Sequence, residues 1–570
     1  MEWKLPGLAA LLLAPICAGQ PAGSSTQLTF AHDIAPIVYE HCASCHRPGE
    51  SGPFPLLTFD DVKKHARQIV TVTQSHYMPP WLPEAGHGDF ADENRLTPEQ
   101  ISKIAGWVAQ GTPEGVEAEI PPLPKFTDGW QLGPPDLIVE APQAFALQAD
   151  GTDVYHNFVL TPKLDRRRFV RAIEVRPGVD LGVGSNAKRI VHHANVIVDR
   201  SGWGHEQEPS PGAGFPGMEL ANRRSVFDSD GYFLFWRPGG TPDVEPDGLA
   251  WTLDPGNDLI LNTHMRPTGK PESIRPMLGL YFTDKPQTKV PMLLQLEHDG
   301  AINIAPGVRD FLVSDDFRLP LDVDALAVFA HAHYLATLME AYATLPDGTR
   351  KWLIRIPAWD QNWQSVYRYR QPLFLPKGTL ISMRYHYDNS VANVRNPNQP
   401  PKRVVAGNHA TDEMGHLWLQ VLPRDPAHQR ELIEALSRHT LEKYPNDFAA
   451  HMTLAAVLLS RANAQAAVPV AQAAVRIEPK SAEAYKLLGD TLGAVGRTPE
   501  AIAQYIQALT LNPDFINARY DLAIALTRAG RYDDAIAQYQ SILTVYPGDP
   551  EVKRRLAEAQ TAKLRQGRVP

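Results

Sequence analysis

The most restrictive feature of this sequence is a period of 34 residues in its C-terminal part, marked by Pro445, Pro479, Pro513 and Pro547. Between these prolines, small and aromatic residues return at matching places. The second unit has Tyr485, Leu488, Gly489, Leu492, Ala501, Tyr505 and Ala508, and the third has Leu522, Ala523, Leu526, Ala535 and Tyr539. Small residues let paired helices approach, and aromatic residues fill the gaps between them. The period therefore predicts a stack of helix pairs.

These positions are similar to those of the tetratricopeptide repeat (TPR). The resemblance implies an all-α TPR solenoid over residues 430–567, in which three repeats form a stacked core and the helix after Pro547 caps the end. It also implies a concave protein-binding surface, so we expect a protein partner for the repeats, which the resemblance does not identify.

A second motif lies near the N-terminus, where residues 42–46 read Cys-Ala-Ser-Cys-His. This is the C-x-x-C-H pattern by which a c-type haem is attached. Cys42 and Cys45 can each form a thioether with a haem vinyl group, and His46 then lies against the iron. A zinc half-site or a disulfide is the alternative, but the mature chain has no further cysteine to complete a Cys-rich metal site. We therefore predict one covalent haem c.

The residues around this motif favour a small all-α cytochrome c domain over residues 25–120. Apolar spacing predicts a helix over residues 30–39, and Thr97 followed by Pro98 predicts the start of a second helix that runs to about residue 110. A short cytochrome c has this frame, with its first and last helices packed around the haem.

The sixth iron ligand should come from between these helices. We favour Met78, which precedes two prolines, because a thioether opposite histidine raises the haem potential and suits electron transfer. His76 is the main rival, followed by His65 and His87.

The first residues indicate export. An apolar run over residues 8–13 is followed by small residues at Ala18 and Gly19, which is typical of a secretory signal peptide over residues 1–19. Covalent haem attachment takes place on the outer side of the bacterial inner membrane. Both features therefore predict a periplasmic or secreted bacterial protein.

Charge and hydropathy exclude several kinds of partner. The net charge of −9 is mild for 570 residues and gives no reason to expect nucleic acid or an anionic membrane. No stretch after the signal is apolar for long enough to cross a bilayer, so no transmembrane segment is expected. Cys17 is a candidate for a lipid anchor, although Ile16 before it is not the small residue that such a site uses.

The central part of the chain has the pattern of β-sandwiches. Short alternating segments such as residues 169–175 are separated by Pro-Gly and Asp-Gly turns, after a proline-rich linker at residues 121–124. The length is enough for two tandem all-β domains, which we place at residues 134–290 and 291–423.

This β region contains four patterns of metal-binding side chains: His192-His193, His264, His331-Ala332-His333 and Met414. His331 and His333 project from one face of a strand and can reach one metal. His192 and His193 would need a bulge, or different ring nitrogens, to share one. Imidazoles suit copper or zinc, whereas a thioether selects Cu(I). Each pattern alone is weak, because an isolated histidine or methionine is more often a packing residue.

Taken in order, the four patterns resemble the copper type II, ascorbate-dependent monooxygenases, the family of peptidylglycine α-hydroxylating monooxygenase and dopamine β-monooxygenase. The resemblance covers roughly residues 134–423, about half the chain. It implies two jelly-roll-like sandwich domains that face each other across a cleft and carry two mononuclear coppers. His192, His193 and His264 would hold the copper that transfers electrons. The other would bind oxygen and substrate at His331, His333 and Met414, the expected catalytic residues.

The chain departs from the family pattern at several positions. Phe329 replaces an arginine that binds the substrate carboxylate in the peptide-processing member, so a less polar substrate is expected. His416 and Trp418 replace an asparagine and a tyrosine of that enzyme, so hydrogen bonding around the ligands should differ. No disulfide is available to the β domains. We interpret His386 and His409 as supporting or surface groups.

We therefore expect an exported copper monooxygenase that hydroxylates a C–H bond of a small organic substrate with O₂. The fused cytochrome c would replace ascorbate and deliver electrons from a periplasmic donor. One alternative is a non-enzymatic haem and copper protein for electron transfer or copper handling, with the TPR repeats as an interaction module. Another makes the repeats primary and the chain an assembly platform, but the full ligand set argues against it.

Overall fold

The computed structural model describes all residues except 1–26, 128, 152, 179–186, 218–230 and 567–570. The expected signal peptide and Cys17 lie outside the described residues. The chain divides into two compact units. The first comprises residues 1–47, 52–79 and 94–126, and the second comprises residues 48–51, 80–93 and 127–570. None of the helices in the described parts is long and apolar enough to cross a membrane.

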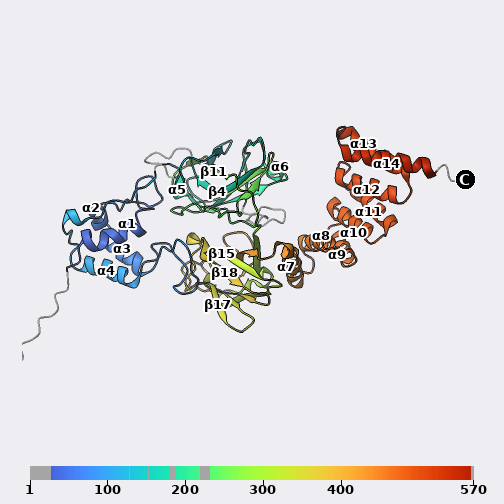
Figure 1. The fold of residues 1–570 in the computed structure, drawn as a ribbon. Coiled ribbons are helices and arrows are strands. Elements are labelled where there is room, and N and C mark those ends of the chain that lie inside the picture. Colours follow the sequence, from blue (N-terminus) through green and yellow to red (C-terminus); the bar gives the residue numbers. More distant parts are fainter. Residues whose placement is uncertain (1–26, 128, 152, 179–186, 218–230, 567–570) are drawn as a thin grey trace, which may run out of the picture. The chain divides into compact units, whose positions relative to one another are not determined.

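The first unit is helical (Figure 1). Its elements are a π-helical turn η1 (Phe30–Ile34), α1 (Ala35–His41), α2 (Phe59–Lys64), α3 (Ala66–Gln74), α4 (Pro98–Ala109) and a 3₁₀ turn η2 (Glu117–Glu119). Both expected helices are present, and α2 and α3 lie between them in the chain. Thr97 caps α4, because its side chain accepts a hydrogen bond from the backbone N–H of Gln100. Phe30 of η1 and Trp107 of α4 pack together in the buried core, with ring centroids 6.3 Å apart.

The second unit begins with a β region whose strands form two groups. The first group contains a four-stranded sheet, in the order β1 (Leu137–Glu140), β11 (Met277–Thr283), β4 (Arg168–Arg176) and β8 (Trp251–Leu253). Its five-stranded sheet has the order β6 (Phe215–Pro216), β3 (Val154–Leu160), β9 (Asp258–Met265), β5 (Val191–Asp199) and β7 (Phe235–Trp236). Smaller elements are β2 (Phe145–Leu147), β10 (Glu272–Ile274), α5 (Ala187–Ile190) and α6 (Trp203–Gln207). Phe158, Trp251 and Leu278 belong to one core cluster fed by both large sheets.

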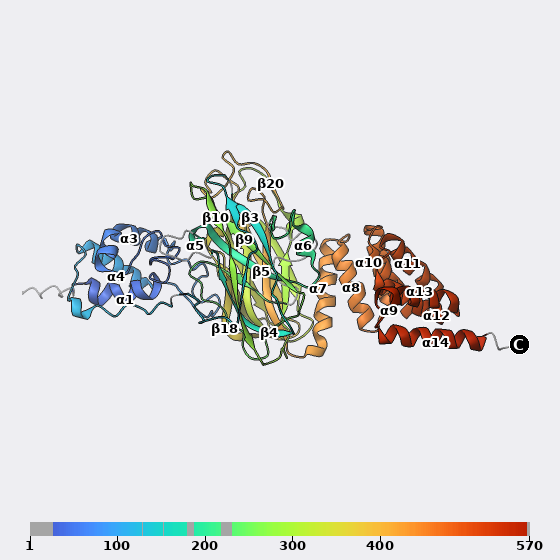
Figure 2. The ribbon, with the colours of Figure 1, turned by 90° about the horizontal axis from the view of Figure 1, so that it is seen from above.

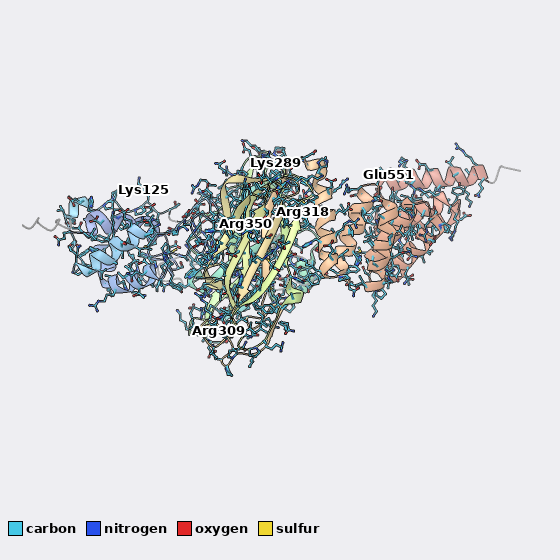
Figure 3. All side chains as sticks on the ribbon, turned by 90° about the horizontal axis from the view of Figure 1, so that it is seen from below. Lys125, Lys289, Arg309, Arg318, Arg350 and Glu551 are labelled. Atoms are coloured by element: carbon cyan, nitrogen blue, oxygen red, sulfur yellow. The ribbon has the colours of Figure 1, made fainter. Side chains whose placement is uncertain are left out.

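The second strand group contains two four-stranded sheets. One has the order β12 (Met292–Glu297), β21 (Gly415–Pro423), β15 (Val323–Ala332) and β18 (Val366–Leu375). The other has the order β14 (Phe311–Arg318), β19 (Leu380–Tyr387), β16 (Ala336–Thr344) and β17 (Arg350–Ile356). Short pieces are β13 (Asn303–Ile304), β20 (Val404–Val405), η3 (Asp299–Ala301) and η4 (Gln361–Trp363). Leu294, Val328 and Tyr385 share the core between the sheets. Charged side chains such as Arg318 and Arg350 lie exposed on the outside of this group (Figure 3).

The ladders between the described strands are all antiparallel, and none joins the two groups. In each group, alternating apolar side chains from two sheets face a common core, as expected where an antiparallel sheet buries one face. The β-rich character predicted for the central region is thus confirmed.

The C-terminal part of the second unit is a series of helices that follow one another as packed pairs (Figure 2). They are α7 (Gln429–Lys443), α8 (Phe448–Ser460), α9 (Ala464–Ile477), α10 (Ala482–Ala494), α11 (Thr498–Leu511), α12 (Ile516–Arg528), α13 (Tyr532–Val545) and α14 (Pro550–Gln566), after the 3₁₀ turn η5 (Pro426–His428). Helices α8, α10, α12 and α14 each begin three residues after one of the periodic prolines. The predicted repeat register is therefore confirmed.

Helix α7 is anchored to the second strand group through a buried carboxylate. Asp315 of β14 accepts hydrogen bonds from His439 at 2.8 Å and from Lys443 at 2.7 Å. Tyr444, directly after α7, donates to Glu297 of β12 at 2.7 Å. These contacts join the helical repeats to the β region.

Candidate metal centre

The first histidine cluster is built by a bulge in β5. In the ladder between β5 and β9, Val191 pairs with Met265 and His193 pairs with His264, so the register shifts at His192. The rings of His192 and His193 lie 5.4 Å and 4.9 Å from the ring of His264. The structure thus brings the three predicted residues together, and of the two arrangements considered for adjacent ligands it contains the bulge.

His264 has a fixed orientation within this cluster. Its Nε2 lies 2.9 Å from a carboxylate oxygen of Asp153, and its ring stacks on Tyr155 at 4.5 Å between centroids. The other nitrogen, Nδ1, is buried and has no hydrogen-bond partner among the described residues. A carboxylate that holds one nitrogen and leaves the other free is the usual arrangement behind a metal-binding histidine.

The second cluster lies at the end of β15. The rings of His331 and His333 are 5.4 Å apart. Nδ1 of His333 lies 3.1 Å from the backbone oxygen of Asp412, while its Nε2 is buried without a partner in the described part of the chain. Nδ1 of His331 lies 2.8 Å from Oε1 of Gln364. Each histidine thus has its Nδ1 held by an oxygen of the protein.

Met414 lies next to this cluster in the sheet. Ala332 of β15 pairs with Gly415 of β21, so the next position of that register sets His333 opposite Met414. The backbone oxygen of Met414 accepts a hydrogen bond from Tyr387 at 2.7 Å. Residues opposite each other in an antiparallel pair have side chains on the same face, which places Met414 on the face of His331 and His333.

Burial keeps these imidazoles neutral. It lowers the pKa of His192 to about 4, that of His331 to about 3 and that of His333 to about 4. The pKa of His193 also falls well below the ordinary value. Neutral imidazoles with a free lone pair are the form that binds a metal.

For two further residues of the site, Glu413 and Gln364, the sequence predicted no role. Glu413, with no exposed surface, accepts hydrogen bonds from the backbone N–H groups of His333, Leu335 and Met414 and so ties the end of β15 to the start of β21. Gln364, directly after η4, contacts both histidine clusters. Besides its bond to His331, its Nε2 lies 3.4 Å from Nδ1 and 3.3 Å from Nε2 of His193. Such a contact depends on tertiary folding and leaves no local pattern.

Aromatic side chains form an apolar surface beside both clusters. Phe235 stacks on His193 at 5.7 Å and packs against Phe329, also at 5.7 Å. Phe329 stacks on His331 at 6.1 Å and contacts Trp418. A cavity of about 100 Å³ begins at this surface, where Phe235 and Phe233 line it together with Tyr367, Arg237 and Arg368. Phe329 thus contributes to a continuous aromatic wall.

The donor chemistry of the two clusters fits copper, because both contain buried neutral imidazoles with unpaired nitrogens, and the second has a methionine on the same face. The imidazole nitrogens of each cluster do not point at one common position. Within the described ranges, no group of three or more His, Cys, Asp or Glu side chains is arranged to hold a metal ion as it stands. The structure therefore gathers the predicted ligands without a closed coordination sphere.

Two other histidines considered from the sequence have partners outside the two clusters. His386 pairs with Asp310 at 2.5 Å, and the backbone N–H of the exposed His409 donates to the carboxylate of Asp412. His416 lies within the second cluster, with its ring 6.2 Å from that of His331.

The haem motif of the first unit follows α1. Cys42 and Cys45 are both free thiols, and burial raises the pKa of Cys42 to about 12. Nδ1 of His46 lies 3.0 Å from the backbone oxygen of Phe54, which leaves Nε2 for an iron ligand. Gly52 passes so close that a Cβ there would lie 2.7 Å from the carbonyl oxygen of Cys45. These features fit covalent haem attachment.

The structure places the candidate sixth ligands in different surroundings. Met78 is partly buried, and its backbone N–H donates to Val72. His76 is exposed. His65 stacks on Phe54 at 3.6 Å, and Phe54 in turn contacts His46. His87 belongs to the second unit, where it packs against Trp352. Met78 stays the prediction.

Comparisons with known proteins concern the helical repeats. Residues 486–550 match the tetratricopeptide repeat family. No curated protein matches the chain. The crystal structure of MamA is similar over 24% of this chain and 80% of that chain, with 22% identity and a TM-score of 0.23. MamA 41-end from Desulfovibrio magneticus RS-1 is similar over 22% of this chain and 70% of that chain, with 23% identity and a TM-score of 0.21. The family match thus places a tetratricopeptide repeat at residues 486–550, within the C-terminal helices.

Proposed function

We propose that this protein is an exported, copper-dependent monooxygenase that hydroxylates a C–H bond of a small, weakly polar organic substrate. The observation that supports this most is the pair of buried histidine clusters, one from each strand group, which Gln364 joins. Copper bound there would supply one-electron redox chemistry and the activation of O₂. The net reaction places one oxygen atom in substrate and reduces the other to water, with two electrons and two protons.

The protein side chains orient the ligands and exclude water. Asp153 fixes the ring of His264, Gln364 fixes that of His331, and the carbonyl of Asp412 fixes that of His333. Each of these bonds occupies one ring nitrogen and leaves the other available. Phe235 and Phe329 give the substrate an apolar surface between the clusters, which suits a C–H bond without a nearby carboxylate.

Electrons enter, in this proposal, through a cytochrome c domain in the first unit. Cys42 and Cys45 hold the haem covalently, His46 and Met78 bind the iron, and a periplasmic protein supplies the electrons. With both axial positions filled, the haem would transfer electrons and leave oxygen chemistry to the β region. The TPR repeats bind a protein partner, whose identity the concave surface alone does not define.

Metal content and oxygen balance test the proposal. We expect two coppers and one haem per chain, and O₂ consumption by the reduced protein only when a substrate is present. His333→Ala should abolish that O₂ consumption. His386→Ala should not, because His386 lies on β19, in the other sheet of this strand group. Zinc or no metal in the β region would contradict the proposal. Copper and haem without substrate-dependent consumption across a panel of apolar compounds would favour electron transfer or copper handling instead.

A further inference from the structure

His416 meets the second histidine cluster directly across the sheet. In the ladder between β15 and β21, the partner of His331 is His416. Opposed residues of an antiparallel pair have side chains on the same face, so both rings project to the side that carries His333 and Met414. We infer that His416 is a third imidazole ligand of the copper at this site, an assignment that rests on the proposed function.

The hydrogen bonding of His416 is that of a metal-binding histidine. Its Nε2 lies 2.7 Å from a carboxylate oxygen of Asp299. His264 of the first cluster has the same contact, because its Nε2 lies 2.9 Å from a carboxylate oxygen of Asp153, and its Nδ1 is buried without a partner among the described residues. A carboxylate behind a ligating histidine fixes its ring and increases its basicity. Each cluster thus has one carboxylate-held imidazole.

The spacing of the rings is compatible with one shared ion. Nitrogen–metal bonds of about 2.0–2.1 Å place a ring centre roughly 3.2 Å from the metal, so two rings on one ion lie at most about 6.4 Å apart, when they are on opposite sides of it. The rings of His331 and His333 are 5.4 Å apart, and those of His331 and His416 are 6.2 Å apart. Ring rotation must still bring the nitrogens together, because the described side chains do not close around a point.

His416 is not an ordinary surface ion pair. Its side chain is 13% exposed and packs edge-on against Trp418 at 4.8 Å. In a comparable pair, His386 of β19 is 27% exposed and its partner Asp310 is 74% exposed. The corresponding value for Asp299, the partner of His416, is 26%. The His416 pair is therefore enclosed where the His386 pair is open, and the latter serves as the matched control.

Three imidazoles would change the metal preference of the site. Two histidines and a thioether favour Cu(I), whereas a third imidazole also suits Cu(II). We therefore expect Met414→Ile to retain Cu(II) at this site, and His416→Asn to weaken Cu(II) binding there at least tenfold. Asp299→Asn, which keeps the ring but alters its support, should weaken binding by about 10- to 100-fold.

The test uses the full haem-containing chain, loaded with Cu(II) alone. X-ray absorption at the copper edge and the nitrogen hyperfine structure in electron paramagnetic resonance count imidazoles without interference from iron absorption. His416→Asn should lose one imidazole per two coppers, and His386→Asn should lose none. The same comparison in a His192→Ala/His193→Ala double variant isolates the second site. If that double variant does not fold, the difference in imidazole count between wild type and His416→Asn in the otherwise native chain gives the answer.

The outcomes separate this assignment from the proposed function. Wild-type protein that binds no copper would contradict the proposed function itself. Two bound coppers with the same imidazole count and affinity in wild type and His416→Asn would overturn the role of His416 alone. Loss of an imidazole in His416→Asn but not in His386→Asn supports the assignment.

Discussion

The side-chain oxygen of Gln364 accepts a hydrogen bond from Nδ1 of His331 at 2.8 Å. The same amide reaches His193 of the other strand group, and Gln364 is only 4% exposed. We expect Gln364→Leu to destabilise the β region by about 1–3 kcal/mol, because the buried Nδ1–H of His331 loses its acceptor. Denaturant unfolding followed by tryptophan fluorescence measures this change in the metal-free protein.

Gln361, three residues earlier, provides the matched control. It is equally buried, but its side-chain oxygen has no hydrogen-bond partner in the described structure. Gln361→Leu removes no such bond, so it should be neutral or slightly stabilising. Equal losses in both variants would show that the Gln364 bond contributes nothing specific.

A pH dependence should arise from Glu413. Burial raises its pKa to about 8, so the folded protein keeps a proton that the unfolded chain loses near pH 4.5. The folded state then binds more protons than the unfolded state between these values, and its stability falls as pH rises from about 4.5 to 8. The effect is on the order of a few kcal/mol for the metal-free protein.

Glu413→Gln isolates this contribution, because the buried histidines titrate alike in both proteins. Hydrogen exchange of β15 and β21, followed by mass spectrometry, should show protection that decreases with pH more steeply in wild type than in the glutamine variant. Parallel pH profiles would mean that Glu413 is ionised in the folded protein.

The joint between the β region and the helical repeats should depend on Asp315. Burial alone would raise the pKa of Asp315. Hydrogen bonds from His439 and Lys443 nevertheless lower this pKa to about 2. The stability that it provides is complete above about pH 4 and is lost as pH falls towards 2. Asp315→Asn should cost about 1.5–3 kcal/mol, because Lys443 loses the nearer of its two carboxylates and keeps only that of Glu297, at 3.2 Å. Faster hydrogen exchange in α7 would report the loss.

The neighbouring carboxylate separates burial from charge. Asp316 pairs with Arg384 at 2.8 Å, but its side chain is 41% exposed. Asp316→Asn should therefore change stability by less than about 1 kcal/mol and leave exchange in α7 unaltered. A similar acceleration in both variants would indicate a general effect of charge on β14.

Met78 is the predicted sixth ligand of the haem iron. Replacement of a methionine by a histidine lowers a haem potential, since a thioether opposite histidine raises it. Met78→His should therefore lower the midpoint in a spectroelectrochemical titration, while His76→Ala should leave it unchanged. If only the His76 variant shifts, that histidine is the ligand.

Local patterns in the sequence predicted the β-rich central region and the C-terminal helical repeats. The proline period sets the starts of α8, α10, α12 and α14, because each repeat packs mainly on its neighbours. A metal shared by His192 and His193 needed either a bulge or different ring nitrogens, and β5 has a bulge. Contacts between distant segments could not be predicted. Gln364 lies 171 residues from His193 in the chain, and Asp299 lies 117 residues from His416. Such pairs form only when the sheets pack.

Two glycine-to-alanine substitutions in α10 should change the stability of the repeats in opposite directions. A Cβ at Gly489 of α10 would lie 2.5 Å from a ring carbon of Tyr505 in α11, whose hydroxyl donates to Asp490 at 2.9 Å. Gly489→Ala should therefore destabilise the repeats by about 1–3 kcal/mol, because the ring must move and the helices must separate. At Gly493, one turn later, the nearest atom would lie 3.8 Å away. Gly493→Ala should stabilise the helix by about 0.5–1 kcal/mol. Thermal unfolding followed by circular dichroism, which reports mainly on helices, measures the change in stability of each variant. A loss of stability in both variants would contradict the packing of Tyr505 against Gly489.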